Sequence, residues 1–291
     1  MSGFGSKFLS LTRVKIGIPV LATLSTVAGY ILAAEGGGLE LALPLLGIFF
    51  LAVGSSALNQ VQDRAFDILM DRTKGRPIPA GILSAREGFW MASLLILVGM
   101  GLLTVTLNPV LIGLGAFAVL WYNGVYTYLK RKSAFAVLPG AIIGSIPPVV
   151  GWVAGGGALL DTQILVVALF FFIWQIPHFW LLVMKYGKDY EKAGIPSMTQ
   201  VFDAEQLARI TFMWVVATAG CCLVMPLVKL VTSYILLGCL VASTIWLVTG
   251  AAKLLQAEGR VQSTRKAFHH INYFALLIIC LLSIDRVASL I

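Results

Sequence analysis

Three side chains suited to binding a hard cation recur at intervals of four residues. They are Asn59, Asp63 and Asp67, and Asp71 continues the series. On a helix each step of four residues turns the side chain by about 40°, so the first three form one stripe and Asp71 lies at its edge. Carboxylates on one stripe repel one another unless a cation lies beside them. Because the ligands are oxygens and no His or Cys is near, the pattern predicts a Mg²⁺ site.

Three basic residues follow the acids at once, in the run Asp71-Arg72-Thr73-Lys74-Gly75-Arg76-Pro77. Carboxylates that hold Mg²⁺ beside Arg and Lys suit a diphosphate, since the metal bridges some oxygens and Arg binds others bidentately. A solvated helix end with paired charges is the alternative explanation. The register of the acids, the basic tail and the apolar stretch that precedes them favour the diphosphate site.

A second charged cluster runs from Lys185 to Lys192, with Asp189 and Glu191 among three lysines and two tyrosines. It has the groups to hold another Mg²⁺ and the other face of a diphosphate. Taken alone, it is better explained as a plain polar loop. Its interest depends on its lying on the same side of the protein as the first cluster.

The composition shows what must position these clusters. Of 291 residues, 59% are hydrophobic and 12% are charged, against about 25% charged in average chains. This excludes a soluble globular protein and leaves no room for a sizeable soluble domain, so we expect one membrane domain over 1–291. The net charge of +8 then reflects membrane orientation rather than nucleic-acid binding, and no nucleic-acid partner is expected.

Nine apolar stretches are each long enough to cross a bilayer as a helix, which takes about 20 residues. The sequence therefore predicts an all-α bundle of about nine transmembrane helices. The first stretch is longer than the apolar core of a signal peptide, so we expect an uncleaved span. The expected spans are about 16–34, 41–62, 88–107, 109–128, 134–154, 162–184, 208–228, 231–252 and 268–288.

The basic residues predict the orientation of this bundle. With a cytoplasmic N-terminus, nineteen of 21 Lys and Arg fall on the cytoplasmic side, and only Lys229 and Arg286 fall opposite. This is a strong positive-inside pattern and indicates a multi-pass protein of the bacterial cytoplasmic (inner) membrane. Two long cytoplasmic segments, about 59–87 and 185–207, hold eight of the 13 acids. Orientation requires no acids, so we expect the active site there.

Three segments of the chain resemble the UbiA-type intramembrane prenyltransferases. Asn59 to Asp67 matches their NxxxDxxxD motif. The resemblance narrows to the heme branch, the protoheme IX farnesyltransferases (heme O synthases), because WQ-x-PHF and DY-x-x-AGIP are typical of it. The segments are NQVQDRAFDILMDRTKGRPIPAG, YTYLKRKSAFAVLPGAIIGSIPPVVGW and WQIPHFWLLVMKYGKDYEKAGIP.

The resemblance implies a fold and a reaction. Nine helices would surround a central cavity that opens to membrane lipid. Farnesyl diphosphate would bind with its head at the two acidic segments, and Mg²⁺ would neutralise the diphosphate as it leaves. The allylic cation would alkylate a vinyl group of heme B and give heme O. A heme A synthase or an oxidase-assembly protein is the candidate protein partner.

The resemblance also implies roles for single residues. Asp63, Asp67 and Asp189 would be catalytic and would hold Mg²⁺, with Asp71 in a lesser role. The candidate diphosphate-binding residues are Asn59, Arg72, Arg76, Lys130 and Lys188.

His178 is the candidate on the heme side. An imidazole within a membrane segment is a functional candidate, and imidazole is a common ligand of heme iron. Pro177 beside it removes a helical hydrogen bond and permits a kink. The alternative is that His178 bonds to the broken backbone there.

Two other functions remain open. A sister enzyme of the family would prenylate a quinone-precursor or chlorophyll-type acceptor, and the acidic motif does not distinguish it. A cation-coupled transporter would also need carboxylates, but these usually lie near the bilayer midplane in broken helices. Here they lie at one membrane face among cations.

Overall fold

The computed structural model describes residues 17–34, 38–256 and 258–290, and every regular element in these ranges is helical. Among the described residues, eight helices are long and apolar enough to cross a membrane, and α2 is an apolar helix of 17 residues. The predicted all-α membrane bundle is therefore confirmed. The elements are α2 (Gly17–Ala33), α3 (Leu39–Gln62), α4 (Arg64–Asp67), α5 (Ala85–Val105), α6 (Pro109–Val119), η1 (Leu120–Tyr126), α7 (Thr127–Leu129), η2 (Ala134–Ala136), α8 (Val137–Gly140), α9 (Ile142–Ala154), α10 (Thr162–Lys192), α11 (Met198–Val201), α12 (Ala204–Val224), η3 (Met225–Val228), α13 (Tyr234–Ala252), η4 (Lys253–Leu255) and α14 (Arg260–Ser289).

Two helices are longer than the hydropathy pattern predicts. The helix expected to end near 184 continues to Lys192, and the last helix begins at Arg260 rather than near 268. Apolar runs mark only the part of a helix that lies in lipid, whereas backbone hydrogen bonding continues into the polar ends. The expected cytoplasmic N-terminal segment, with Lys7, Arg13 and Lys15, lies outside the described residues.

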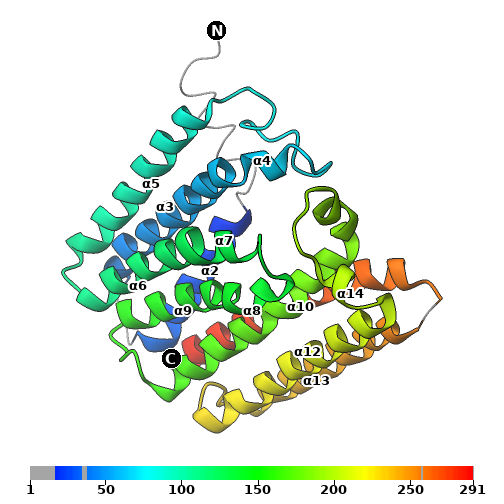
Figure 1. Cartoon of the computed structure of the whole chain (residues 1–291). Helices are drawn as coiled ribbons and strands as arrows, with labels where there is room; N and C mark the ends of the chain where they lie inside the picture. The colour runs from blue at the N-terminus through cyan, green and yellow to red at the C-terminus, as the bar shows by residue number, and fades with distance from the viewer. Residues whose placement is uncertain (1–16, 35–37, 257, 291) are drawn as a thin grey trace.

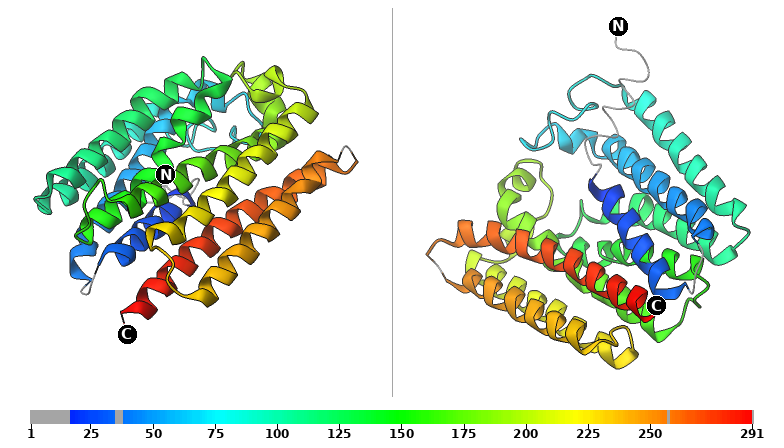
Figure 2. Two further views of the ribbon diagram at one scale, coloured as in Figure 1. Left: turned by 90° about the horizontal axis from the view of Figure 1, so that it is seen from below. Right: turned by 180° about the vertical axis from the view of Figure 1, so that it is seen from behind.

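The helices form two groups joined by a central pair (Figures 1 and 2). One group contains α3, α5 and α6, and the other contains α10, α12, α13 and α14; α2 and α9 pack against both groups. The segments that follow α3 and α10 lie side by side at the same end of the bundle in these views. The two charged clusters therefore meet in space, as the orientation argument requires.

Glycines let the central pair pack backbone against backbone. A Cβ atom placed on Gly151 of α9 would lie 1.8 Å from the carbonyl oxygen of Thr26 on α2. One placed on Gly29 of α2 would lie 2.0 Å from the carbonyl oxygen of Pro148 on α9. Small residues at such crossings are typical of membrane helices, where van der Waals contact rather than water exclusion drives association.

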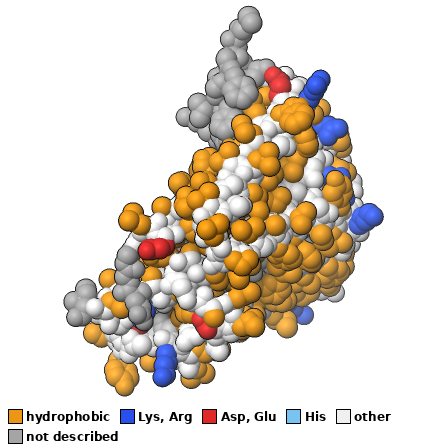
Figure 3. All heavy atoms as spheres, turned by 90° about the vertical axis from the view of Figure 1, so that its left-hand side faces the viewer, with side chains coloured by type: hydrophobic (Ala, Val, Ile, Leu, Met, Phe, Trp, Pro, Cys, Tyr) orange, Lys and Arg blue, Asp and Glu red, His pale blue; other side chains and the backbone are white. Residues whose placement is uncertain are grey.

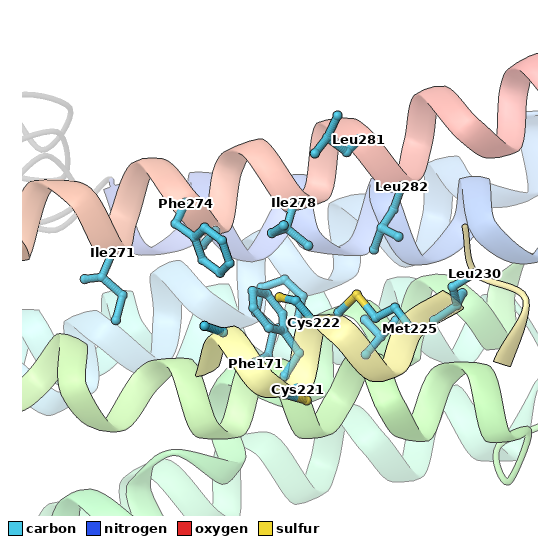
Figure 4. Packing of buried hydrophobic residues seen from close by; sticks show 14 of the residues in the cluster. Phe171, Cys221, Cys222, Met225, Leu230, Ile271, Phe274, Ile278, Leu281 and Leu282 are labelled. Atoms are coloured by element: carbon cyan, nitrogen blue, oxygen red, sulfur yellow. The ribbon is translucent and has the colours of Figure 1, made fainter. Parts of the chain in front are cut away.

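The largest buried cluster among the described residues extends over α9, α10, α12, α13 and α14. Figure 4 shows Phe171 of α10, Cys222 of α12 and Phe274 of α14 within it, and all three side chains are buried. The outside of the bundle is also apolar. Figure 3 shows a face covered largely by hydrophobic side chains, and Leu94 and Leu97 of α5 are more than half exposed, as lipid-facing residues should be.

We expect Gly151→Ala to lower the free energy of unfolding by about 1–3 kcal/mol, the usual cost of overpacking, because the backbone of Thr26 cannot yield. Denaturation of the purified protein in detergent measures it. Gly113→Ala on α6 is the matched control, since nothing lies within 4 Å of a Cβ there. Equal losses in the two variants would contradict the close-packing argument.

Candidate active site

Asp63 lies at a break in the predicted stripe. The sequence predicts one helix through Asn59, Asp63 and Asp67, but α3 ends at Gln62 and α4 begins at Arg64. The amide of Asp63 donates to the carbonyl of Asn59 at 2.9 Å, and the amide of Asp67 donates to that of Asp63 at 2.8 Å. The i to i−4 pattern thus continues across the break.

Two cations bind the carboxylate of Asp63, which is only 5% exposed. Lys130 pairs with Oδ2, and Nη2 of Arg131 lies 3.1 Å from Oδ1. Burial lowers the pKa of Lys130, while the Asp63 carboxylate acts in the opposite direction. The sequence predicted Lys130 but missed Arg131. The run of three bases from Lys130 to Lys132 was the available signal, and it does not show which base turns inward.

Arg76 binds Asp67, the second acid, which is 2% exposed. Nη1 of Arg76 lies 2.6 Å from Oδ2 of Asp67. The hydroxyl of Thr73 donates to the carbonyl of Asp67 at 2.8 Å, which folds the basic tail back over the acids. The structure thus brings the predicted pair of acids together with two of the predicted diphosphate-binding cations, Lys130 and Arg76.

A π-helical segment, η1, lies against the first motif. Asn59 donates to the hydroxyl of Thr127 at 3.0 Å, and that hydroxyl donates to the carbonyl of Tyr122 at 2.8 Å. A π-helix forms i to i+5 bonds and is frequent at functional sites. Asn59 therefore has a structural partner on the neighbouring span, which places the start of the motif.

Asn123 is the buried polar residue of η1 and interlocks with Gln62. Its Nδ2 donates to Oε1 of Gln62 at 3.1 Å and to the carbonyl of Ser55 at 3.1 Å. Nε2 of Gln62 donates in return to the carbonyl of Asn123 at 2.9 Å. The sequence did not predict this pair, because a hydropathy profile shows Asn123 only as a weakly polar position in the fourth span and gives no information on its partner.

The second charged segment meets the first through Arg72. Its amide donates to Oδ2 of Asp189 at 3.2 Å, and its guanidinium donates to the hydroxyl of Tyr190 at 3.3 Å. The guanidinium also lies 5.1 Å from the ring centre of Tyr186. A buried apolar cluster of Met70, Ala193 and Ile195 backs this contact.

Asp71 links the two segments as well. It forms ion pairs with Lys192 at 2.6 Å and Lys74 at 2.7 Å. Hydrogen bonds from these lysines, Lys192 first, lower the pKa of Asp71 to about 2. The residue is therefore ionised throughout the physiological range. Asp71, the fourth acid of the series, therefore joins the two charged segments, whereas Asp63 and Asp67 are buried.

Two predicted residues lie apart from the buried acids. Within 17–34, 38–256 and 258–290, no three or more His, Cys, Asp or Glu residues come together as a ligand group, so Asp189 does not join Asp63 and Asp67. Lys188 is exposed and forms no ion pair with any described residue. The carboxylates of Asp63 and Asp67 themselves fit Mg²⁺, which usually takes one or two carboxylates and completes its shell with phosphate and water oxygens.

His178 pairs with another side chain rather than with the backbone. Its Nδ1 lies 2.9 Å from Oδ1 of Asn272 on α14, and its ring centre lies 5.0 Å from that of Trp174 and 5.1 Å from that of Phe268. Pro177 lies inside α10, and a kink with non-helical backbone angles lies further along the helix, at Tyr186. The alternative explanation of His178 is a hydrogen bond to the broken backbone near Pro177. The hydrogen bond that its ring forms among the described residues is to the side chain of Asn272 instead.

Comparison with known sequences decides the family. The sequence model of the UbiA prenyltransferase family matches residues 22–273. The chain belongs to the UbiA prenyltransferase family. It is thus a multi-pass integral membrane protein, and the predicted family is confirmed.

Relatives of this UbiA family member include protoheme IX farnesyltransferases. The chain is 36% identical over 280 residues to that of Nitratidesulfovibrio vulgaris (strain DP4), covering 96% of this chain and 94% of the relative. It is 40% identical over 210 residues to that of Geobacter sulfurreducens, covering 72% and 77%. The solved structure of a UbiA homolog from Archaeoglobus fulgidus bound to GPP and Mg²⁺ superposes with a TM-score of 0.71 at 17% identity, covering 97% and 99%. At that identity the likeness shows the shared fold.

We expect Asn123→Leu to lower the free energy of unfolding by about 1–3 kcal/mol, because it removes the amide that donates to the carbonyl of Ser55 in a buried bond and to Oε1 of Gln62. Thermal denaturation in detergent measures the loss. Gly124→Ala is the matched control, since it is the next residue of η1 and nothing lies within 4 Å of a Cβ there. If Asn123→Leu melts like the wild type, the interlock does not hold η1 against α3.

Proposed function

We propose that this protein transfers a farnesyl group from farnesyl diphosphate to a vinyl group of protoheme IX (heme B), giving heme O. The observation that carries the donor half is the burial of Asp63 and Asp67 among Lys130, Arg131 and Arg76. The protoheme IX farnesyltransferases that align with most of this chain support heme as the acceptor.

The charge balance of the buried site suits a diphosphate. Three cations face two carboxylates, an excess of one positive charge. Buried charges need partners, and the acids serve as these partners while no substrate is bound. A bound Mg²⁺ would neutralise charge on the leaving diphosphate. Asp63 and Asp67 would hold it, which frees Lys130, Arg131 and Arg76 to bind diphosphate oxygens.

The chemistry then requires that the diphosphate leave with the bonding electrons of the farnesyl C–O bond. The vinyl π electrons attack the allylic cation, and water adds to the new cation with loss of a proton. The cations of this chain stabilise the diphosphate while that bond breaks, which is the kind of electrostatic term that contributes most to catalysis.

The second segment completes the proposed donor site. Asp189 is the proposed metal-binding acid there and Lys188 a proposed diphosphate-binding residue. The contact of Asp189 with the amide of Arg72 supports this, since it puts an acid of the second segment beside a cation of the first. We further propose that one domain over 1–291 carries out the reaction, with His178 on the heme side. The site would lie on the cytoplasmic face of the bacterial inner membrane. A heme A synthase or an oxidase-assembly protein is the proposed protein partner.

Acceptor choice is tested directly with the purified full chain. Incubation with Mg²⁺, farnesyl diphosphate and heme B should give a product with the mass of heme O, whereas 4-hydroxybenzoate should give none. Mass spectrometry reads both reactions. Product from 4-hydroxybenzoate alone would replace heme with a quinone-precursor acceptor.

We expect Asp63→Asn and Asp67→Asn each to lower kcat for farnesyl transfer by about 10²–10³, the effect of removing one group that stabilises developing charge. Asp71→Asn is the control, because Asp71 is an exposed acid of the same series and pairs with lysines outside the buried site. Its activity should stay within a few fold of the wild type. Thermal denaturation of each variant separates a lost active site from a lost fold.

Removal of divalent metal should abolish turnover, and Mg²⁺ should restore it. Chelation would remove the Mg²⁺ that Asp63 and Asp67 are proposed to hold and would leave the cations paired with their acids. Rates measured against free Mg²⁺ should show saturation, with a weaker apparent affinity in Asp67→Asn. Full turnover in chelator would contradict the metal role of the two aspartates.

A further inference from the structure

The helices α10 and α14 run antiparallel and meet along a stripe of aromatic and polar side chains. The indole of Trp174 donates to the carbonyl of Ile271 at 2.9 Å. One turn further along α10, His178 contacts Asn272 and Phe268. The ring contacts of α10 run from Phe170 with Phe274 to His178 with Phe268, so the two helices pair in opposite directions. The stripe therefore leads toward the end of the bundle that carries the charged segments.

A small pocket of about 100 Å³ opens at that end of the stripe. Its lining combines apolar and aromatic side chains with polar ones, and it includes two cations, Lys185 of α10 and Arg265 of α14. Neither cation forms an ion pair with a described residue. A pocket of this kind selects an amphiphile whose apolar body carries carboxylate or phosphate groups at one edge. The lining residues are Leu181, Leu182, Lys185, Tyr186, Thr264, Arg265, Phe268 and His269.

Asn272 fixes the tautomer of His178. Nδ2 of Asn272 donates to the carbonyl of Phe268 at 2.5 Å, so its Oδ1 is the atom that faces His178. Because Oδ1 only accepts, Nδ1 of His178 must carry the proton. In the neutral ring this leaves a lone pair on Nε2, which accepts no hydrogen bond from any described residue. An imidazole held in this way by a partner on its other nitrogen is typical of metal-ligating histidines.

Tyr186 joins this pocket to the donor site. Its ring lines the pocket and lies 5.1 Å from the guanidinium of Arg72. His178 and Lys185 lie seven residues apart on α10, about 10 Å along the axis, which is comparable to the reach from a porphyrin iron to its propionate carboxylates. One face of α10 thus offers an iron ligand and a carboxylate-binding rim beside the prenyl donor.

We propose that the face between α10 and α14 is the acceptor site, where Lys185 and Arg265 pair with the propionates of heme and Nε2 of His178 faces its iron, with Asn272 as the positioning residue. This inference rests on the proposed function, since it assumes a heme acceptor. The pocket holds only the carboxylate edge, and the rest of the macrocycle lies along the stripe toward His178.

The carboxylate contacts are tested by binding. The full chain in neutral detergent is titrated with heme B and with its dimethyl ester, which lacks the carboxylates. Lys185→Gln and Arg265→Gln should each weaken heme B binding about fivefold, the scale of a partly exposed ion pair, and leave ester binding unchanged. Lys266→Gln is the matched control, because Lys266 is the next residue of α14 and does not line the pocket. Equal effects on binding of the acid and of the ester would overturn the proposal.

The iron contact is tested by absorption spectroscopy of the same titrations. His178→Ala should lose the Soret band of imidazole-bound heme. Asn272→Leu should weaken binding about 10–100-fold, as loss of such a supporting partner does, whereas Asn272→Asp keeps the acceptor and should keep the spectrum. His270→Ala is the control, since His270 packs on Trp246 away from the stripe. An unchanged Soret band in His178→Ala would overturn the iron contact.

The two proposals fail in different ways. If the wild type neither binds nor converts heme B, the proposed function is wrong. If the wild type converts heme B and these variants bind and convert it equally well, heme is the acceptor but lies elsewhere. In both cases binding of farnesyl diphosphate with Mg²⁺, measured by calorimetry, should be unaffected in His178→Ala, because its contacts do not reach the buried acids.

Discussion

The site depends on one interaction, the buried pairing of Asp63 with Lys130 and Arg131. A charge removed from water needs a partner of opposite sign, and no base near Asp63 in sequence supplies it. The partners come from the end of the span that runs from Pro109 to Leu129, 67 and 68 residues further along the chain. The pairing therefore fixes how two spans meet at the membrane face.

Around that pairing the polar groups of the membrane segments are matched to one another. The π-helical turn of η1 would expose backbone carbonyls to lipid, where an unpaired group costs several kcal/mol. Gln62 and Thr127 satisfy the carbonyls of Asn123 and Tyr122. The same bonds hold the start of the acidic motif. Gln62 and Thr127 thus stabilise η1, and η1 in turn fixes the position of the motif that begins at Asn59.

The charged residues at this end of the bundle fall into a buried group and an exposed group. The buried acids carry an excess of basic partners, whereas Asp71 joins the two charged segments through exposed lysines. Arg72 and Tyr186 lie between the donor site and the stripe of α10 and α14. Under the proposed function, a donor with a dense negative charge and a large flat acceptor would approach from two neighbouring faces.

The sequence alone determined the helical membrane bundle, the positions of most spans and the Asn59–Asp63–Asp67 motif, because hydropathy and i, i+4 spacing are local properties. It predicted Arg76 from the basic run that follows the acids, and Lys130 only through a family resemblance. It missed Arg131, the Asn123–Gln62 interlock and Asn272, and it placed a continuous helix where α3 breaks before Asp63. These features depend on which spans become neighbours and which way each side chain turns. Only the tertiary structure decides this, since contacts between residues far apart in the chain leave no periodic trace in it.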